Sequence, residues 1–468
     1  MKMIKLFAIL CVITLCAGIT SCGGDDTTTI VGNEGGSGSI IGTVAIVDVK
    51  KAGLLSTLIS DDAKYNITDL TVKGDINGDD ISFIREMAGA DVNGDETKGH
   101  LSKLSMKDAN IVAGGKPYYV ETTTSAYYSR TNVLTSCMFS KCNKLSSVIF
   151  PDNVTMIEEA IFSHYDYKLE EWKGNPNVTS IIMGDKVTSI YDRAFAGTGI
   201  KNIDIPNSVT KMGTKVFSGC SNLNTINLPS SITDIGSIYS GCTGITHITI
   251  PSGTTIIAYG AFEGCEALKD ITIPDNVIGI REGAFKGCKS LVSVSIGKGL
   301  CYIGDSSGGF SGGFTFWGCN SLMKFTVSED NPNFASVDGI LLSKNKSQLM
   351  AYPHAKPINI PSSVTSINGR HYYNNEMYCI SPFSRSPLTS VTIPNNIDGI
   401  IGAFNFCSQL TEVHIKCTTP PSLRTIEDAR SSSFFFLNEK CILYVPKGTL
   451  TAYNESDWKS MFNNIVEE

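Results

Sequence analysis

IDIPNSVTKMGTKVFSGCSNL (residues 203–223) is followed in this chain by three near copies of itself: INLPSSITDIGSIYSGCTGI (226–245), ITIPSGTTIIAYGAFEGCEAL (248–268) and ITIPDNVIGIREGAFKGCKSL (271–291). The prolines of the four copies, at positions 206, 229, 251 and 274, are separated by 23, 22 and 23 residues. A fixed period of roughly 20 to 50 residues is typical of a solenoid, in which each repeat forms one rung and packs against its neighbours. We therefore expect a stack of similar rungs.

Each copy predicts two strand-like pieces and a corner. The first piece alternates apolar and polar residues, as in Ile248-Thr-Ile250, and a period of two is typical of a half-buried strand. Proline ends this strand because it has no N–H for a ladder. Apolar residues three and six positions later form the second piece, and the corner follows with an aromatic residue, a glycine and a cysteine, as in Phe262-Glu-Gly-Cys265. We expect the aromatic ring to fill the interior and the glycine to permit the tight turn beside it.

The same frame extends in less regular form over residues 134–416, which we take as the repeat array. Residues 325–360 break the period, and their short apolar runs predict a hairpin unit inserted between rungs. A content of 44 glycines and a charged fraction of 18% fit such a turn-rich, well-buried architecture.

Residues 1–21 have the pattern of a secretory signal peptide, with a short basic start and an apolar run too short for a comfortable membrane span. The run ends in Ile-Thr-Ser-Cys22, which resembles a lipobox, so we expect Cys22 to be lipidated and to become the new N-terminus. The Gly-Gly-Asp-Asp that follows resembles the surface-export signal of Bacteroidota lipoproteins, and a plain secretory peptide is the alternative. Residues 22–39 are rich in Gly, Thr, Ser and Asp and predict a flexible tether. These features predict an outer-membrane lipoprotein on the cell surface, with membrane contact only through the lipid.

The charge balance gives no sign of a nucleic-acid partner. The chain has 38 basic and 45 acidic residues, a net charge of −7, and loss of the two lysines in the signal peptide leaves −9. No basic run or basic helix occurs, so we expect no nucleic-acid binding.

Residues 40–133 predict an N-terminal cap made of irregular repeats that contain helices. Apolar residues at helical spacing predict helices over residues 49–60 and 81–88, and strand-like runs begin at Ile67 and Leu101. An array needs such a cap because an end rung would otherwise leave its apolar face in water.

One loop in this cap starts like a calcium site. Asp91-Val-Asn93-Gly-Asp95 has oxygen ligands at the first, third and fifth positions. It then departs from the pattern, because Glu96 stands where the turn glycine belongs and Ser102 replaces the bidentate glutamate. An Asx-rich surface turn is favoured over calcium binding, which the sequence leaves open.

Seven cysteines share the corner position of the repeat, and we expect them to form a ladder of small, buried hydrophobic side chains: residues 142, 220, 242, 265, 288, 319 and 407. Neighbouring rungs would hold their Cα atoms close enough for a bridge, but identical stacked positions do not make disulfide dihedral angles easy. There is no C-x-x-C, and the six histidines do not cluster with these cysteines. We therefore expect no metal site and no cofactor.

The frame I-x-I-P-x-x-V-x-x-I…A-F-x-G-C resembles the BspA-type leucine-rich repeat of surface proteins in Bacteroidota. The resemblance implies an α/β solenoid, a right-handed leucine-rich-repeat superhelix with parallel strand ladders, short helical or 3-10 corners, a helix-containing N-terminal cap and a β-rich C-terminal cap. Residues 417–468 resemble the ending of that family and are taken as the C-terminal cap. Cys417 and Cys441 flank this cap and are a candidate disulfide pair.

Three insertions interrupt the frame at the aromatic corner, over residues 163–177, 304–315 and 368–382. Each carries aromatic residues that we take as candidate ligand contacts: Tyr165, Tyr167, Trp172, Phe310, Phe314, Tyr372, Tyr373 and Tyr378. Aromatic side chains on loops favour protein or carbohydrate binding. The alternative, which we weigh slightly higher, is that the insertions fold back and cover neighbouring rungs.

Catalysis has little support in the sequence. Residues 309–313 match G-x-S-x-G, but they lie in a glycine-rich insertion without a strand–turn–helix context. We therefore predict a non-enzymatic, monomeric cell-surface adhesion protein. The family resemblance implies that it binds a host matrix protein, a host-cell surface or other bacteria. A glycan-capture lipoprotein of a polysaccharide-uptake system and a structural surface spacer are the alternatives.

Overall fold

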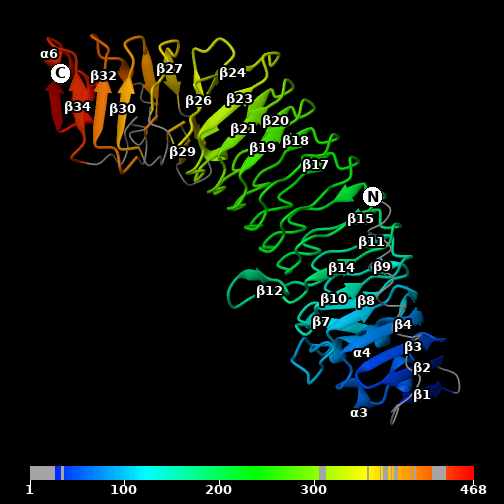
Figure 1. Ribbon diagram of the computed structural model, residues 1–468. Helices are drawn as coiled ribbons and strands as arrows, with labels where there is room; N and C mark the ends of the chain where they lie inside the picture. Colours follow the sequence, from blue (N-terminus) through cyan, green and yellow to red (C-terminus); the bar gives the residue numbers. More distant parts are fainter. Residues whose placement is uncertain are drawn as a thin grey trace, which may run out of the picture.

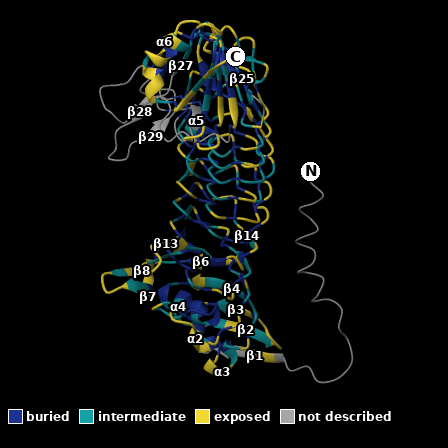
Figure 2. Ribbon diagram, turned by 90° about the vertical axis from the view of Figure 1, so that its left-hand side faces the viewer, coloured by how far each residue is buried: buried dark blue, intermediate teal, exposed yellow. Residues whose placement is uncertain are grey.

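The computed structural model (Figure 1) describes residues 27–32, 36–304, 312–355, 358–368, 370–372, 378–380, 382–383, 388–401, 403–404, 407–423 and 439–468. The rungs follow one another along a curved solenoid, with the N-terminal cap at one end and the C-terminal cap at the other (Figure 1). The expected solenoid of parallel ladders is confirmed. Its interior is buried along the whole length, and exposed residues lie on the outer turns and hairpins (Figure 2).

Most rungs give one strand to each of two ladders. The first ladder contains β5 (Lys103–Ser105), β10 (Ser147–Ile149), β14 (Ser180–Ile182), β19 (Asp270–Ile273), β21 (Ser293–Ile296), β23 (Lys324–Val327), β30 (Ser390–Ile393), β32 (Glu412–Ile415), β34 (Ile442–Val445) and β35 (Asn464–Glu467). The second contains β9 (Val133–Leu134), β11 (Met156–Ile157), β15 (Ser189–Ile190), β16 (Lys211–Met212), β17 (Asp234–Ile235), β18 (Ile256–Ile257), β20 (Gly279–Ile280), β22 (Tyr302–Ile303), β27 (Ser366–Asn368), β31 (Gly399–Ile401) and β33 (Ser422–Leu423). Equivalent repeat positions pair across rungs, so like residues lie above one another.

The corner aromatics form a stack through the interior. Tyr239, Phe262 and Phe285 are buried, with neighbouring ring centroids 5.6 and 5.2 Å apart and ring planes 10° from parallel. At the first insertion, the Phe150 ring lies between the corner rings of residues 162 and 195, at 6.2 and 6.5 Å. A strand residue therefore continues the stack where the chain leaves the array.

The corner cysteines are buried as expected, and they are also hydrogen-bond donors. The Sγ atom of Cys220 lies 3.1 Å from the carbonyl oxygen of Phe195, the corner aromatic of the preceding rung. The same bond recurs at Cys242, Cys265, Cys288, Cys319 and Cys407. Burial raises the pKa of the Cys220 thiol to about 11, so this thiol keeps its proton at neutral pH. Among the described residues of the array, the corners are hydrogen-bonded turns rather than the expected helical or 3-10 segments, apart from the one helical turn α5 (Gly312–Thr315).

Both ladders are interrupted in the middle of the array. The rung at residues 226–245 has ten residues from its proline to its aromatic ring, whereas the next rung has eleven. The structure describes every residue from 200 to 250, yet β16 and β17 belong to separate sheets. In the first ladder, one isolated bridge joins Asp204 to Asn227. The corner hydrogen bonds continue, from the Phe217 N–H to the Ile238 carbonyl and onward.

The N-terminal cap combines an extended sheet with short helices. The strands β1 (Thr27–Gly32), β2 (Gly36–Ile41) and β3 (Val44–Val49) are antiparallel, and β3 then pairs in parallel with β4 (Asp69–Ile76). The tether expected over residues 22–39 is therefore wrong where the structure describes it, since β2 pairs with the otherwise open edge of β3 and the β-branched residues of β1 pair with β2. The structure leaves residues 1–26 outside its description.

The helix expected over residues 81–88 is confirmed as α4 (Gly78–Met87), which begins with a capping box between Asn77 and Asp80. The helix expected over residues 49–60 is reduced to α2 (Leu55–Leu58), with α3 (Asp61–Lys64) after it. The cap also contains β6 (Ala109–Ile111) and the hairpin of β7 (Gly114–Thr122) and β8 (Ser125–Ser129).

The inserted unit expected near residues 325–360 is an antiparallel sheet of β24 (Phe334–Val337), β25 (Ile340–Ser343) and β26 (Leu349–Ala351). Two hydrophobic cores meet in it, because Leu341 packs with the N-terminal core and Leu342 with the C-terminal one. The C-terminal cap adds α6 (Leu450–Asn454) and a 3-10 turn, η2 (Asp457–Ser460). Its Trp458 is fully buried, and the indole N–H donates to the Pro421 carbonyl at 2.9 Å.

Candidate functional site

An antiparallel hairpin projects from the array at the first insertion, on the inner side of the curve (Figure 1). Its strands are β12 (His164–Asp166) and β13 (Glu171–Lys173), and Tyr165 faces Trp172 across them. In the turn, the Asp166 carboxylate accepts the N–H groups of Lys168 and Leu169 at 2.9 and 3.2 Å. These donors lower the pKa of Asp166, so the turn keeps its negative charge.

Three aromatic side chains of this insertion touch one another, and we call them the hairpin patch: Tyr165, Tyr167 and Trp172. The Tyr165 ring meets Tyr167 at 5.1 Å and an 80° angle, and Trp172 at 5.8 Å and 64°. Edge-to-face contacts of this kind add stability beyond the buried area. Tyr167 is 65% exposed and Trp172 41%, so the patch is both ordered by its own contacts and open to solvent.

The patch is fixed to the next rung by Arg193. Its guanidinium carbon lies 4.7 Å from the centre of the Trp172 ring, which is a cation–π contact. The φ angle of Arg193 is 53°, in the left-handed region that later rungs fill with Gly260 (59°) and Gly283 (66°). Ala160 and Lys215 hold the same corner position in neighbouring rungs with φ angles of 55° and 56°, so the array accepts a side chain there at a cost on the order of 1 kcal/mol.

The insertion rejoins the array at a point where the backbones of two glycines approach closely. The Cα atom of Gly174 would lie 2.7 Å from a Cβ built on Gly197, and Gly197 has a φ of 66°. Any side chain at Gly197 would therefore push the end of the hairpin away from the rung.

A shallow hollow lies beside the hairpin, and we call it the acidic hollow. It is lined by Arg130, Ser136, Met156, Glu158, Glu159, Tyr191 and Asp192, with a volume of about 440 Å³. Asp192 immediately precedes Arg193 in the chain, so the hollow adjoins the residue that holds Trp172. Tyr191 is 43% exposed and forms an aromatic wall of the hollow.

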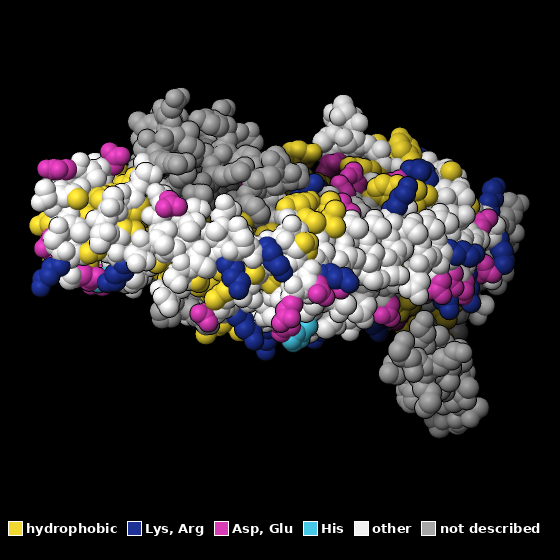
Figure 3. Space-filling view, turned by 90° about the horizontal axis from the view of Figure 1, so that it is seen from above, with side chains coloured by type: hydrophobic (Ala, Val, Ile, Leu, Met, Phe, Trp, Pro, Cys, Tyr) yellow, Lys and Arg dark blue, Asp and Glu magenta, His cyan; other side chains and the backbone are white. Residues whose placement is uncertain are grey.

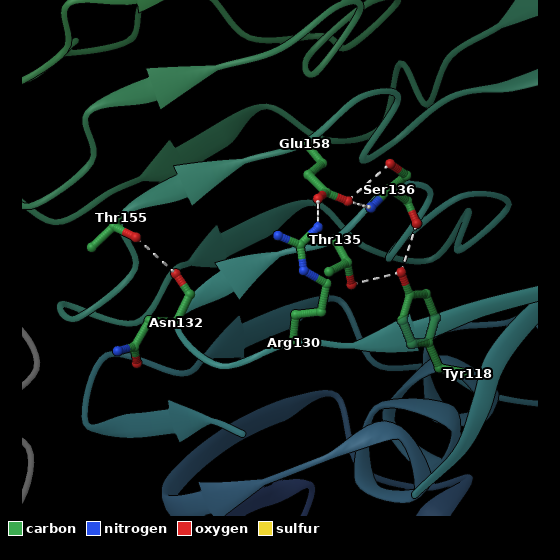
Figure 4. A network of polar contacts seen from close by, with 7 residues as sticks. All are labelled: Tyr118, Arg130, Asn132, Thr135, Ser136, Thr155 and Glu158. Carbon is green, nitrogen blue, oxygen red and sulfur yellow. Dashed lines mark hydrogen bonds and ion pairs between the residues drawn. The ribbon is translucent and has the colours of Figure 1, made fainter. Parts of the chain in front are cut away.

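A polar network fixes one side of the acidic hollow (Figure 4). The Glu158 carboxylate pairs with Arg130 and accepts both the N–H and the hydroxyl of Ser136, at 3.0 and 3.1 Å. The buried Tyr118 hydroxyl donates to the Ser136 carbonyl at 2.6 Å and meets the Thr135 hydroxyl at 2.8 Å. Glu158 therefore has a structural role, since its carboxylate oxygens are engaged by neighbouring residues.

Two other carboxylates of the hollow keep free acceptors. Asp192 uses Oδ1 to accept the Thr214 N–H at 2.7 Å. Glu159 has no cation within ion-pair distance among the residues that the structure describes.

The other candidate residues are not brought together with this site. Phe310 and Tyr373 lie outside the described residues. Tyr372 is the last residue of β28 (Arg370–Tyr372) and pairs with Tyr378, the first residue of β29 (Tyr378–Ile380). Phe314 is half-buried, and its ring lies 5.7 Å from Trp317 and 5.6 Å from the Lys286 ammonium. Phe314 thus follows the alternative expectation that an insertion covers neighbouring rungs.

Cys417 and Cys441 form no disulfide in the structure. The Cys417 thiol donates to the Pro394 carbonyl at 3.1 Å, and burial raises the pKa of Cys441 to about 12. Each thiol thus has its own buried environment beside the C-terminal ladder.

The calcium-like loop is an Asx turn, since the Asp91 carboxylate accepts the N–H groups of Asn93 and Asp95, both at 2.8 Å. Across the described part of the chain, no three His, Cys, Asp or Glu side chains gather as metal ligands. Within the same part, no helix has the length and apolar character to cross a membrane. Cys22, the expected lipidation site, lies outside it.

Surface charge is mixed rather than concentrated. Figure 3 shows Lys and Arg side chains interspersed with Asp and Glu on the face it presents. Several of these pair between neighbouring rungs, as Lys286 does with Glu263 and Lys289 with Glu266. Such exposed pairs contribute little to stability and do not mark a ligand site.

Sequence reasoning selected the hairpin patch but missed the residues of the neighbouring rung that complete the site. One weak signal was present: Arg193 stands where two later copies have Gly260 and Gly283, although the copies in between have Lys215 and Ser237. The acidic hollow had no comparable signal, because Arg130, Glu159 and Asp192 come from three different rungs and look like ordinary surface residues.

The family model described as BspA type Leucine rich repeat region matches the chain in six copies, over residues 118–183, 139–255, 171–289, 236–380 and 346–436. A comparison with curated proteins finds no match.

Solved structures give further comparisons. A leucine-rich repeat protein from Bacteroides ovatus is 18% identical, with 96% of this chain and 100% of that chain covered and a TM-score of 0.46. A leucine rich cell surface protein from Faecalibacterium prausnitzii is 15% identical, with 97% and 96% covered and a TM-score of 0.39. The pneumococcal vaccine antigen PcpA is 15% identical, with 94% and 98% covered and a TM-score of 0.26.

Proposed function

Because the chain belongs to the BspA-type leucine-rich-repeat family, we propose that it is a non-enzymatic surface protein that binds a macromolecular ligand through its solenoid. The regular rungs serve as scaffold, since their aromatic and cysteine side chains are engaged by the neighbouring rungs. Ligand contacts then fall to the positions where the repeat is interrupted.

The observation that carries the proposal is the hairpin patch. Tyr, Trp and Arg are the residues most enriched among the energetically dominant contacts of protein interfaces. Here Tyr167 and Trp172 lie on a projecting hairpin, where both rings contact Tyr165 and Arg193 of the next rung lies over Trp172. These contacts hold the rings in place before any ligand arrives. Ordering the rings in advance lowers the entropy that binding would otherwise cost.

The ligand class that we propose is a protein on a host matrix, a host cell or another bacterium. The cell-surface location would come from a lipid on Cys22, which we propose as the anchor in the outer membrane. The protein would act as a monomer, because a solenoid presents its whole length to a partner without needing a second copy.

Binding of the purified full-length chain to immobilised matrix proteins, mucin, whole cells and a glycan panel tests this proposal. We expect protein binding that falls at least about tenfold in Trp172→Ala. Tyr259→Ala is the matched control, because Tyr259 is 48% exposed and has Arg281 over its ring at 5.3 Å in a regular rung. Binding to glycans alone would favour the glycan-capture function instead, and binding to nothing would favour a structural spacer.

A further inference from the structure

We infer that the acidic hollow receives a positively charged Lys or Arg side chain of a protein partner whose neighbouring residues pack on the hairpin patch. The inference deepens the proposed function, since it names the chemistry of the partner at the same site. It rests on three observations: the residues that line the hollow, the Arg193 guanidinium that packs on Trp172 beside it, and the net negative charge of the site and of the chain.

The hollow has acceptors that the protein itself does not use. The Asp192 Oδ1 atom accepts the Thr214 N–H at 2.7 Å, which fixes the carboxylate and leaves its second oxygen for a ligand. Glu159 lines the same hollow, and the described residues supply it with no ion-pair partner. A Lys or Arg head group supplies three to five N–H donors and so matches two carboxylates together.

The wall of the hollow suits the stem of such a side chain. Tyr191 and Met156 give it apolar surface beside the carboxylates. Lys and Arg bury their methylene groups along apolar surface while the charged head meets polar atoms.

The Arg193 side chain, next to the hollow, shows that a cationic group is accommodated beside an aromatic ring in this part of the surface. The Arg193 guanidinium lies 4.7 Å from the centre of the Trp172 ring and follows Asp192 directly in the chain. The same combination of aromatic face and carboxylate is available to a partner at Tyr167, which is 65% exposed, and Tyr191, which is 43% exposed.

The net charge of the site is negative. The hollow, the hairpin and Arg193 together contain six acidic side chains and four basic ones: Glu158, Glu159, Asp166, Glu170, Glu171 and Asp192, against Arg130, Lys168, Lys173 and Arg193. Two of the basic groups already form ion pairs within the site, since Arg130 pairs with Glu158 and Lys173 with Glu171. The whole chain also carries −7, so a basic partner is attracted and an acidic one repelled.

The experiment uses the full-length chain and two synthetic peptides of equal length, one of Lys, Arg, Tyr, Gly and Ser and one with Glu and Asp in place of the basic residues. The fluorescence of Trp172 is the readout, because this indole is 41% exposed, whereas Trp458 is fully buried and the half-buried Trp317 packs against Phe314. We expect a saturable change with the basic peptide alone, and at least about a tenfold loss of affinity between roughly 0.05 and 0.5 M salt.

The decisive variant is the double change Glu159→Gln and Asp192→Asn. Both substitutions keep the size and the oxygen acceptor, so the Thr214 N–H retains its partner. We expect the affinity for the basic peptide to fall at least about fivefold, and the thermal unfolding midpoint to stay unchanged. The double change Asp152→Asn and Asp185→Asn is the matched control, because these residues lie in the turns before β11 and β15, in the same two rungs, and make the same charge change away from the hollow.

Equal affinity of the double variant and the control would overturn the inference. If the full-length chain still bound a matrix or cell-surface protein in that case, the proposed function would stand without the charged contact. If neither peptide nor any panel member bound, both would fail. A double variant that unfolded at a lower temperature would be replaced by Glu159→Gln alone, for which at least about a twofold loss is expected and no loss overturns the inference.

Discussion

The Sγ atom of Cys242 lies 3.0 Å from the carbonyl oxygen of Phe217, one rung earlier in the stack. The thiol thereby joins two rungs at the corner, in addition to filling space there. Replacing this cysteine with alanine therefore removes both the hydrogen bond and part of the packing.

We expect Cys242→Ala to lower the free energy of unfolding by about 1 to 3 kcal/mol, through the lost hydrogen bond and a small cavity. Chemical denaturation of the full-length chain measures the change. Cys301→Ala is the control, because Cys301 is exposed, and its change should stay within about 0.5 kcal/mol. Equal effects of the two substitutions would show that the corner thiol contributes nothing specific.

Gly197→Ala and Gly241→Ala differ only in what the new methyl group meets. Both glycines have left-handed φ angles, 66° and 75°, so both substitutions strain the backbone by about 1 kcal/mol. A Cβ at Gly197 would lie 2.7 Å from the Gly174 Cα atom, whereas at Gly241 the nearest atom is 3.4 Å away. We therefore expect Gly197→Ala alone to loosen the hairpin, seen as faster tryptic cleavage at Lys168 and Lys173. Equal cleavage in the two variants would contradict the role of the Gly174–Gly197 contact.

We expect Arg193→Gly to change the environment of Trp172 without changing the thermal stability of the chain. Glycine relieves the left-handed backbone at φ 53°, a gain of up to about 1 kcal/mol that offsets the lost cation–π contact of similar size. We expect a thermal unfolding midpoint close to that of the parent chain, together with a red-shifted Trp172 emission as the ring loses its cover. An unchanged emission spectrum would show that Arg193 does not hold the indole.

The C-terminal strand should loosen in acid. Lys416 and His414 both contact the Glu468 carboxylate, the latter at 2.8 Å, and the bond from Lys416 is the main cause that lowers the pKa of Glu468. A depressed folded pKa gives stability that is fully present above the unfolded value, about 4.5, and that is lost as the pH falls through the folded value. Hydrogen exchange of β35, corrected for intrinsic rates, should therefore rise between about pH 5 and pH 3 more than that of β19. Glu468→Gln should remove this difference, and a persistent difference would assign the effect to other groups.

Much of the fold follows from the repeat because each copy obeys the same physical constraints. Pro274 ends a strand, Phe285 fills the interior and Cys288 lies in the corner for reasons that local sequence shows. The strands β1 and β2 were missed, since a stretch of Thr, Gly and Ser looks like a tether until an unpaired edge such as β3 is available.

The site was predictable only in part, for a related reason. An insertion can be counted in the sequence, and Tyr165, Tyr167 and Trp172 were selected in this way. Their contact with Arg193 depends on how the chain returns to the next rung, which the sequence does not encode locally. Phe314 belongs to an insertion of the same kind and packs against Trp317, so composition alone does not separate a covering loop from a projecting one.

We expect the solenoid to bend most easily at the short rung at residues 226–245. It is joined to the preceding rung at the aromatic corner, where Phe217 and Tyr239 stack at 6.3 Å, while the strands β16 and β17 of these two rungs do not pair. Opening the ladder side breaks few hydrogen bonds, whereas opening the corner side would separate stacked rings and thiol–carbonyl bonds. We therefore expect flexing at this rung to be directional, with a partner that contacts both halves of the solenoid setting the curvature there without unfolding the other rungs.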